Sequence, residues 1–285
     1  MGKGLAFLSP WLIGFFVFTL VPVLLSLYYS LCDYTLLQKP VFIGATNYQT
    51  LYNDPVFWKA LGNTFKYALL ALPAAMVVSL GLALLLNADI KGQAIYRTII
   101  FLPSLVPAVA SAMLWLWLFN AQFGLINLML GKIGIPGPPW LGNEKWALPA
   151  LAFMSLWGVG QTVVIYLAGL QDVPKELYEA AELDGANPWQ RLRNVTIPMI
   201  SPVIFFNLIM AIIGTMQVFT QPFIMTQGGP ARATYMFTYY LYDNAFTFMK
   251  MGYASAMAWV QLLIIVFFTA IAFWSSKKWV HYSAK

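Results

Sequence analysis

Long runs without any charged residue limit what this chain can fold into. About 20 apolar residues cross a lipid bilayer as a helix, and six runs are long enough: Gly4–Cys32, Tyr67–Ala88, Thr98–Gly131, Trp146–Gln171, Asn194–Ala231 and Met251–Ser276. Charged residues make up only 9% of the chain, and the mean hydropathy is +0.71. This composition excludes an ordinary soluble domain and predicts an all-α, polytopic membrane protein.

We expect one transmembrane helix in each of the six runs. Two runs are much longer than one span needs, so each of these should include a polar end outside the hydrocarbon. The expected helices are Phe7–Leu31, Tyr67–Leu86, Ile99–Phe119, Leu148–Leu170, Met199–Phe219 and Tyr253–Trp274. The first run begins directly after Lys3 and is too long for a signal peptide, so it is interpreted as a retained span. With both termini inside, nine of the 16 basic residues lie in the shorter inner segments, and this density favours cytoplasmic termini.

Few side chains could carry catalytic or metal chemistry. Cys32 is the only cysteine and His281 the only histidine. The chain by itself therefore cannot assemble a disulfide framework, a zinc site or a Cys–His nucleophile. The formal charge of +6 comes from basic residues spread singly over the loops, which argues against nucleic-acid binding. We expect no enzyme activity, no metal site and no bound cofactor.

The expected span cores contain no Asp, Glu, Lys, Arg or His. Ion-coupled carriers usually hold an ionisable group in the membrane, because the coupling ion must bind there. Neutral oxygens at broken helices can also bind sodium, so an ion-coupled secondary transporter that acts without an ATPase stays open as the alternative. The sequence favours a driving force supplied by another protein.

Uncharged polar groups do occur inside the expected spans. Gln161, Thr215 and Gln217 would be costly in lipid, so they should face a partner or a cavity. Two interpretations remain open, namely hydrogen bonding between helices and the lining of a solute path. Amide and hydroxyl groups beside an aromatic face such as Trp157 suit a neutral polyhydroxylated solute better than an ion.

One polar segment, Asp172–Pro198, interrupts the hydrophobic sequence and holds five of its ten carboxylates. Its helix start and stop signals predict two short helices. Asp172 is placed to cap the first helix and Gly185 to end it, whereas Asn187 repeats the start signal and Pro198 would stop the second helix. The first helix is too short to be stable alone. Its acidic face suits a protein partner better than a lipid surface, because helices lying on lipid favour basic residues.

The sequence EAAELDGA at Glu179–Ala186, followed by Ile197–Pro198, resembles the cytoplasmic signature of ABC-importer permeases. The fuller wording PKELYEAAELDGANPWQRLRNVTIP is similar to the carbohydrate-uptake branch, which includes the maltose and glycerol-phosphate importers. YRTIIFLPSLVPAVASAMLWLWLF and QGGPARAT extend the resemblance along the chain. Extra leading helices and a large external insert, as in the maltose permease, are absent, so the chain is similar to the shorter permeases of this branch.

The resemblance implies one permease domain over residues 1–285, with a cytoplasmic coupling segment at residues 172–198. In that family the acidic helix seats in a cleft of a cytoplasmic ATPase. The corresponding coupling residues here are Glu179, Ala180, Ala181, Asp184 and Gly185. The sugar contacts of the maltose permease correspond by position to Trp157, Gly158, Gln161, Gly214, Thr215, Gln217 and Val218.

The function implied is that of a permease subunit in an ATP-driven importer of a sugar, oligosaccharide or related polyol. Its implied partners are a second permease subunit, two cytoplasmic ATPase subunits and an extracytoplasmic solute-binding protein. ATP and magnesium would be used by the ATPase subunits and not bound by this chain. The implied location is the cytoplasmic (inner) membrane of a bacterium or archaeon, with the lipid bilayer around the spans.

Overall fold

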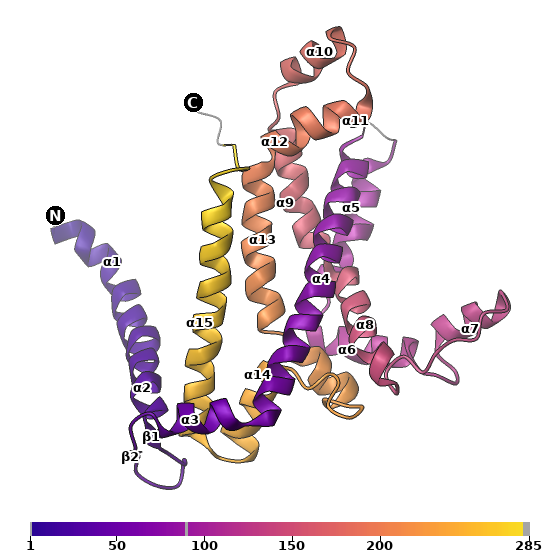
Figure 1. Cartoon of the computed structure of the whole chain (residues 1–285). Helices are drawn as coiled ribbons and strands as arrows, with labels where there is room; N and C mark the ends of the chain where they lie inside the picture. The colour runs from indigo at the N-terminus through magenta and orange to yellow at the C-terminus, as the bar shows by residue number, and fades with distance from the viewer. Residues whose placement is uncertain (1, 89–90, 282–285) are drawn as a thin grey trace. The chain divides into compact units, whose positions relative to one another are not determined.

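The structure, a computed structural model, describes residues 2–88 and 91–281, with only the backbone described for residues 2–6. Within these residues the only strands are β1 (Cys32–Asp33) and β2 (Val41–Phe42), which pair antiparallel. All other regular structure is helical (Figure 1). Contacts divide the chain into two units, residues 1–59 with 237–264 (unit 1) and residues 60–236 with 265–285 (unit 2).

Unit 1 combines the N-terminal helices of the chain with the segment that leads into the last helix. It contains α1 (Gly2–Phe15), α2 (Val21–Ser30), α3 (Thr46–Asn53), α14 (Phe237–Tyr242), and the first parts of α4 (Pro55–Asn87) and α15 (Met251–Ser276). π-Helical turns at Phe16–Leu20 and Asp243–Thr247 extend α1 into α2 and prolong α14. The side-chain amide of Asn47 in α3 donates to the carbonyls of Ser30 and Cys32, both at 2.9 Å, and so ties α3 to the end of α2.

The carboxylate of Asp54 joins three elements of unit 1. It accepts hydrogen bonds from the hydroxyls of Tyr240 and Tyr253, the latter at 2.8 Å, and from the backbone N–H of Val56 at 2.8 Å. Burial raises the pKa of this carboxyl, but the hydrogen bonds outweigh burial and hold the pKa below its usual value. The ionised carboxylate therefore holds the start of α4 to α14 and α15.

Unit 2 contains the remaining helices and the short turns that join them. The helices are the rest of α4, α5 (Gln93–Phe101), α6 (Ala108–Leu118), α7 (Leu125–Lys132), α8 (Glu144–Ser155), α9 (Gly160–Gln171), α10 (Lys175–Leu183), α11 (Pro188–Arg191), α12 (Ile197–Met199), α13 (Ser201–Met216) and the end of α15. The 3-10 turns lie at Leu102–Leu105 and Leu156–Gly158, and the π-helical turns at Leu192–Thr196 and Pro222–Thr226.

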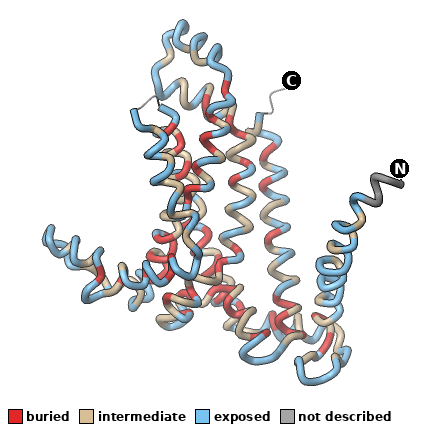
Figure 2. The backbone as a smooth tube through the Cα atoms, turned by 180° about the vertical axis from the view of Figure 1, so that it is seen from behind, coloured by how far each residue is buried: buried red, intermediate tan, exposed pale blue. Residues whose placement is uncertain are grey.

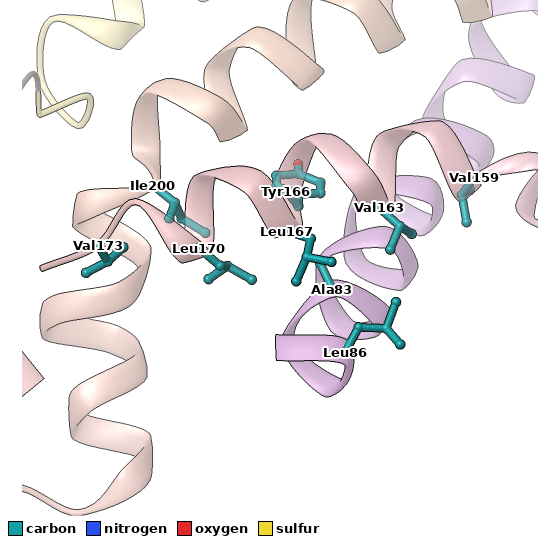
Figure 3. Close-up of a cluster of buried hydrophobic side chains, with 9 residues drawn as sticks. All are labelled: Ala83, Leu86, Val159, Val163, Tyr166, Leu167, Leu170, Val173 and Ile200. Atoms are coloured by element: carbon teal, nitrogen blue, oxygen red, sulfur yellow. The ribbon is translucent and has the colours of Figure 1, made fainter. Parts of the chain in front are cut away.

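A buried core in unit 2 holds α9 to α4 and to the start of α13. Four side chains of α9 recur at helical spacing and form one apolar face, which packs on α4 residues and on Ile200 (Figure 3). The members from α9 are Val163, Tyr166, Leu167 and Leu170, and those from α4 are Ala83 and Leu86. Many residues of unit 2 outside this core are exposed (Figure 2). Many of the exposed side chains are large and apolar, as expected for helices that face lipid or partner subunits.

Three of the six expected spans are continuous helices and three are bent. The continuous helices are Phe7–Ser30, Pro55–Asn87 and Met251–Ser276. The second begins well before the expected Tyr67, because Lys59 and Lys66 lie inside its first turns and a search for charge-free runs excludes them. The bent pairs are Gln93–Leu105 with Ala108–Leu118 (99°), Glu144–Gly158 with Gly160–Gln171 (50°) and Pro188–Met199 with Ser201–Met216 (68°). Among the described residues, six spans are reached only when each bent pair counts as one.

Replacing Asp54 by asparagine tests the junction in unit 1. Asp54→Asn should lower the free energy of unfolding by about 1 kcal/mol, because bonds to a charged acceptor are stronger than bonds to a neutral amide and this site is only partly buried. A depressed carboxyl pKa contributes stability above the unfolded value of about 3.9 and loses it as the pH falls further. Thermal unfolding of the purified protein should therefore separate Asp54→Asn from wild type at neutral pH and less so in acid. Asp33→Asn, an exposed carboxylate of the same unit, is the control; equal melting temperatures for wild type and Asp54→Asn at neutral pH would contradict the assignment.

Candidate functional site

The first helix of the polar segment, α10, differs from the expectation at its start and agrees at its end. Its N-cap residue is Pro174, and Asp172 instead follows α9 as its C-cap, so the predicted Asp172 cap is wrong. The residue before a proline is disfavoured in the helical conformation, which delays the start of α10 until after Pro174. At the other end Gly185 has φ +77°. The backbone N–H of Gly185 donates to the carbonyl of Glu182 at 3.0 Å, and the N–H of Ala186 donates to the carbonyl of Ala181 at 2.9 Å. This pair of bonds is a Schellman motif, so Gly185 ends the helix as predicted.

The second helix begins where the sequence predicts and ends later. The side-chain oxygen of Asn187 accepts from the N–H of Gln190 at 2.9 Å, and the side-chain oxygen of Gln190 accepts from the N–H of Asn187 at 2.8 Å. This capping box starts a helical rod, Pro188–Met199, that runs through Pro198 and breaks at Ile200. The expectation that Pro198 stops the helix is wrong, because the wider π-helical turn before it accommodates its ring.

Two contacts join α10 to the Pro188–Met199 rod. The hydroxyl of Tyr178 lies 3.0 Å from the hydroxyl of Thr196, which is buried. Glu182 forms an ion pair with Arg191. Because the ion pair is largely exposed, it adds little stability by itself, and the Tyr178–Thr196 contact is the better-protected link.

The outer surface of this helix pair is acidic with large apolar side chains. Its exposed carboxylates belong to Glu176, Glu179, Glu182 and Asp184. Leu183 is 90% exposed and Trp189 is 67% exposed. Apolar groups of this size beside several acids are typical of a surface that a protein partner covers.

A cavity of about 420 Å³ lies between α4, the break of the fourth expected span, and the end of α13. Five of the seven predicted solute-path residues line it: Gly158, Gly214, Thr215, Gln217 and Val218. Gln161 is exposed and is absent from its wall, although Thr162 beside it belongs to the wall. The helical turn of 100° per residue points these neighbours in different directions, which spacing along the sequence alone did not resolve.

The polar groups of this cavity differ in how far they are already hydrogen-bonded. Thr215 donates its hydroxyl to the carbonyl of Ala211 at 2.7 Å, within its own helix. Gln217 is the C-cap of α13 and is exposed, and its side chain has no hydrogen-bond partner among residues 2–88 and 91–281. Gln217 is therefore the more available of the two to a passing solute.

A second cavity of about 260 Å³ adjoins the first and contains Trp157. Ser155, Gly158 and Gln221 line both cavities. The remaining wall includes Pro103, Ser104 and Ser111 from the broken third span. Sequence reasoning counted Ser155 and Gln221 among the uncharged polar residues of the fourth and fifth spans, but it missed Ser111 as a lining residue. The signal that could have found Ser111 is the pair Pro103 and Pro107, which interrupts an otherwise apolar run.

A close backbone approach holds the two broken spans together beside these cavities. A Cβ at Gly160 would lie 2.6 Å from the carbonyl oxygen of Ile100 and 2.8 Å from the Cα of Phe101. Only glycine fits at such a distance. The start of α9 and the end of α5 are thereby in direct backbone contact.

Ionisable side chains do not gather into a metal-binding group in the part of the chain that the structure describes, where no three His, Cys, Asp or Glu residues come together. Neither cavity wall includes a carboxylate, an amine, a guanidinium or an imidazole. The cavity walls can offer hydrogen bonds to an uncharged polar solute.

Bent apolar helices around an uncharged polar cavity, with a short polar helix pair at one end, define a membrane-embedded transport subunit. Residues 75–281 match the family model described as "Binding-protein-dependent transport system inner membrane component", and the chain belongs to this family. It is 41% identical over 287 residues to the probable ABC transporter permease protein YesP of Bacillus subtilis (strain 168), with 99% of this chain and 93% of that protein covered. It is 36% identical over 286 residues to the lactose transport system permease protein LacF of Rhizobium radiobacter, with 97% and 94% covered.

The fold is also that of a solved transporter. A crystal structure of a bacterial alginate ABC transporter in complex with an alginate pentasaccharide-bound periplasmic protein matches with a TM-score of 0.82 and 23% identity, over 96% of this chain and 93% of that one. The family consists of membrane subunits that transport solutes and are not enzymes. The chain is therefore a permease subunit of an ABC transporter.

Proposed function

We propose that this permease carries a carbohydrate, such as a sugar, an oligosaccharide or a related polyol, in an ATP-driven importer. The observation that carries the proposal is the 420 Å³ cavity, whose polar groups are amides and hydroxyls without a charged side chain. Sugars present hydroxyls and apolar ring faces, which these groups and the ring of Trp157 in the adjoining cavity can meet. The lactose permease and the alginate transporter that the chain resembles support the same class of solute.

The proposed solute path passes Trp157, Gly158, Gly214, Thr215, Gln217 and Val218, with Gln161 as a further candidate from the resemblance alone. Gln217 is the best candidate among them to hydrogen-bond a solute, since its side-chain amide is exposed and lacks a hydrogen-bond partner within the described chain. A site that hydrogen-bonds hydroxyls leaves its own groups unpaired when a hydroxyl is missing, which gives it selectivity.

Residues 172–198 are the proposed coupling segment of a single permease domain. Glu179, Ala180, Ala181, Asp184 and Gly185 would meet a cytoplasmic ATPase subunit at the acidic surface of α10. Movement there has two direct routes to the cavity, since α10 follows the cavity-lining α9 and the Pro188–Met199 rod precedes α13. Tyr178 and Thr196 link the two routes at 3.0 Å.

The proposed assembly contains a second permease subunit, two ATPase subunits that use ATP and magnesium, and an extracytoplasmic solute-binding protein. It would lie in the cytoplasmic membrane of a bacterium or archaeon with the termini of this chain in the cytoplasm. Membership of a binding-protein-dependent family favours this assembly over the ion-coupled alternative. ATP-dependent sugar uptake by proteoliposomes that contain the assembled subunits tests the proposal, and uptake driven by an ion gradient without ATP would overturn it.

Gly185 provides the test of coupling. Gly185→Val places a β-branched residue at φ +77°, at an open position where a Cβ would meet nothing within 4 Å, so only the backbone conformation is strained. The strained backbone conformation should cost about 1–3 kcal/mol of free energy at this turn. We expect normal insertion with joint loss of uptake and of solute-stimulated ATP hydrolysis. Gly185→Asn is the matched control, because asparagine tolerates positive φ, and it should retain most of both activities. Normal uptake by Gly185→Val would remove the segment from the mechanism.

Gln217 provides the test of the solute path. Gln217→Leu should weaken uptake about tenfold or more, or change preference within a panel of sugars and polyols, because one missing hydrogen bond to a polar solute costs about 1–3 kcal/mol. Expression and basal ATP hydrolysis should persist. Gln161→Leu makes the same chemical change outside the cavity wall. An equal effect of the two variants on preference would favour the positions of the resemblance over the geometry of the cavity, and a lower yield with fixed preference would show that Gln217 is only a packing residue.

A further inference from the structure

The connection between α6 and α8 is a compact excursion with a single charge. Residues 120–143 contain Lys132 and no other charged residue, although they lie between two membrane-spanning segments. The excursion includes α7 and returns through a segment rich in proline and glycine, Gly134–Trp140. An ordinary aqueous loop of this length would carry more charge.

Asn127 in α7 closes the excursion on itself. Its side-chain amide donates to the carbonyls of Ala121 at 3.1 Å and Pro138 at 3.2 Å, and its oxygen accepts from the indole N–H of Trp140 at 2.6 Å. Gly137 packs so closely on the Asn127 side chain that no Cβ would fit there. These contacts make the excursion a structured body, and they use both the nitrogen and the oxygen of the Asn127 amide internally.

The opposite side of α7 is apolar and uncovered. Leu125, Leu128, Met129 and Lys132 recur at i, i+3, i+4 and i+7 and share one face. Leu128 is 53% exposed and Met129 is 58% exposed, and Ile133 just beyond the helix is 70% exposed. The one cation lies at the end of this apolar face.

The position of the excursion indicates what covers that face. It begins where α6 ends and finishes where α8 begins. When each bent pair counts as one span, both ends of the excursion fall at the same membrane surface. In both views α7 projects sideways from that end of unit 2, across the direction of α9 and α13, instead of continuing away from the spans (Figures 1 and 2). Trp140 packs on Phe119 and Trp146, with ring centroids 5.6 and 5.4 Å apart. Aromatic side chains of this kind are enriched at the lipid interface.

We propose that α7 is an interfacial anchor that lies in the lipid surface with Leu125, Leu128 and Met129 in the acyl boundary and Lys132 at the phosphate level. A lysine at the end of an apolar face can extend its ammonium to lipid phosphates while its stem remains in the apolar layer. A protein interface would need a polar rim with free hydrogen-bonding groups, whereas the central amide of this excursion is already used internally. Anchored in this way, the excursion holds the ends of α6 and α8, and thereby the bent third span, at a fixed depth.

The test is a spin label on the apolar face of α7 in the full chain with its partner subunits. Leu128→Cys in a Cys32→Ala background is labelled with a nitroxide and placed in nanodiscs of phosphatidylcholine and phosphatidylglycerol. Collision rates with oxygen, which concentrates in lipid, and with a water-soluble nickel chelate are then measured. Gln122→Cys, at the polar start of the same excursion, is the matched comparison.

An interfacial anchor predicts frequent collision with oxygen and little with nickel at Leu128, with an oxygen-to-nickel ratio several-fold above that at Gln122. Frequent collision with nickel at Leu128 would show that α7 stands in water and would overturn the proposal. Protection from both reagents would show that a protein covers α7 and would overturn it equally. Met129→Cys, on the same face, gives the same decision if the Leu128 variant does not assemble.

Discussion

The backbone groups at the three helix bends constrain the rest of unit 2, because an unpaired N–H or C=O is costly inside a membrane. A serine lies next to each bend and donates its hydroxyl to the carbonyl three residues earlier at 2.6 Å, namely Ser104 to Phe101, Ser155 to Ala152 and Ser201 to Pro198. Pro198 needs this donor because the residue four positions on, Pro202, has no N–H. Irregular backbone at membrane depth is tolerated where it lines a cavity. The bend of the fourth span lines both the 420 Å³ and the 260 Å³ cavity, and the bend of the third span lines the smaller one.

The same bends connect solute handling to the cytoplasmic partner that we propose. The fourth expected span, which is bent, continues from the cavity wall through α9 into α10. The fifth expected span runs from the Pro188–Met199 rod across Ile200 into α13. Under the proposed coupling, a displacement of the α10 surface would be carried by two helices that both reach the 420 Å³ cavity. Gly160 and Ile100 bring the third span into the same backbone contact network. Coupling needs no charged residue in the membrane under this arrangement.

Much of this organisation could be predicted from the sequence, and the exceptions have physical causes. Charge-free runs located the three continuous apolar helices and the three bent pairs. Glycine and asparagine signals predicted the end of α10 and the start of α11. A count of apolar residues carries no information on helix direction, so it missed the bends, and it placed α7 within the overlong third run. Side-chain direction around α9 places Gln161 outside the cavity wall and Thr162 inside it, and this direction depends on where the helix starts, at Gly160.

The central claim is that the acidic helix pair faces the cytoplasm, opposite the α7 excursion. Cysteine labelling in a Cys32→Ala background measures this directly. A membrane-impermeant maleimide applied to intact cells should label Gln122→Cys and leave Leu183→Cys, whose parent side chain is 90% exposed at the end of α10, unlabelled until the cells are permeabilised. Labelling of Leu183→Cys in intact cells would place the helix pair outside and contradict its coupling to a cytoplasmic ATPase.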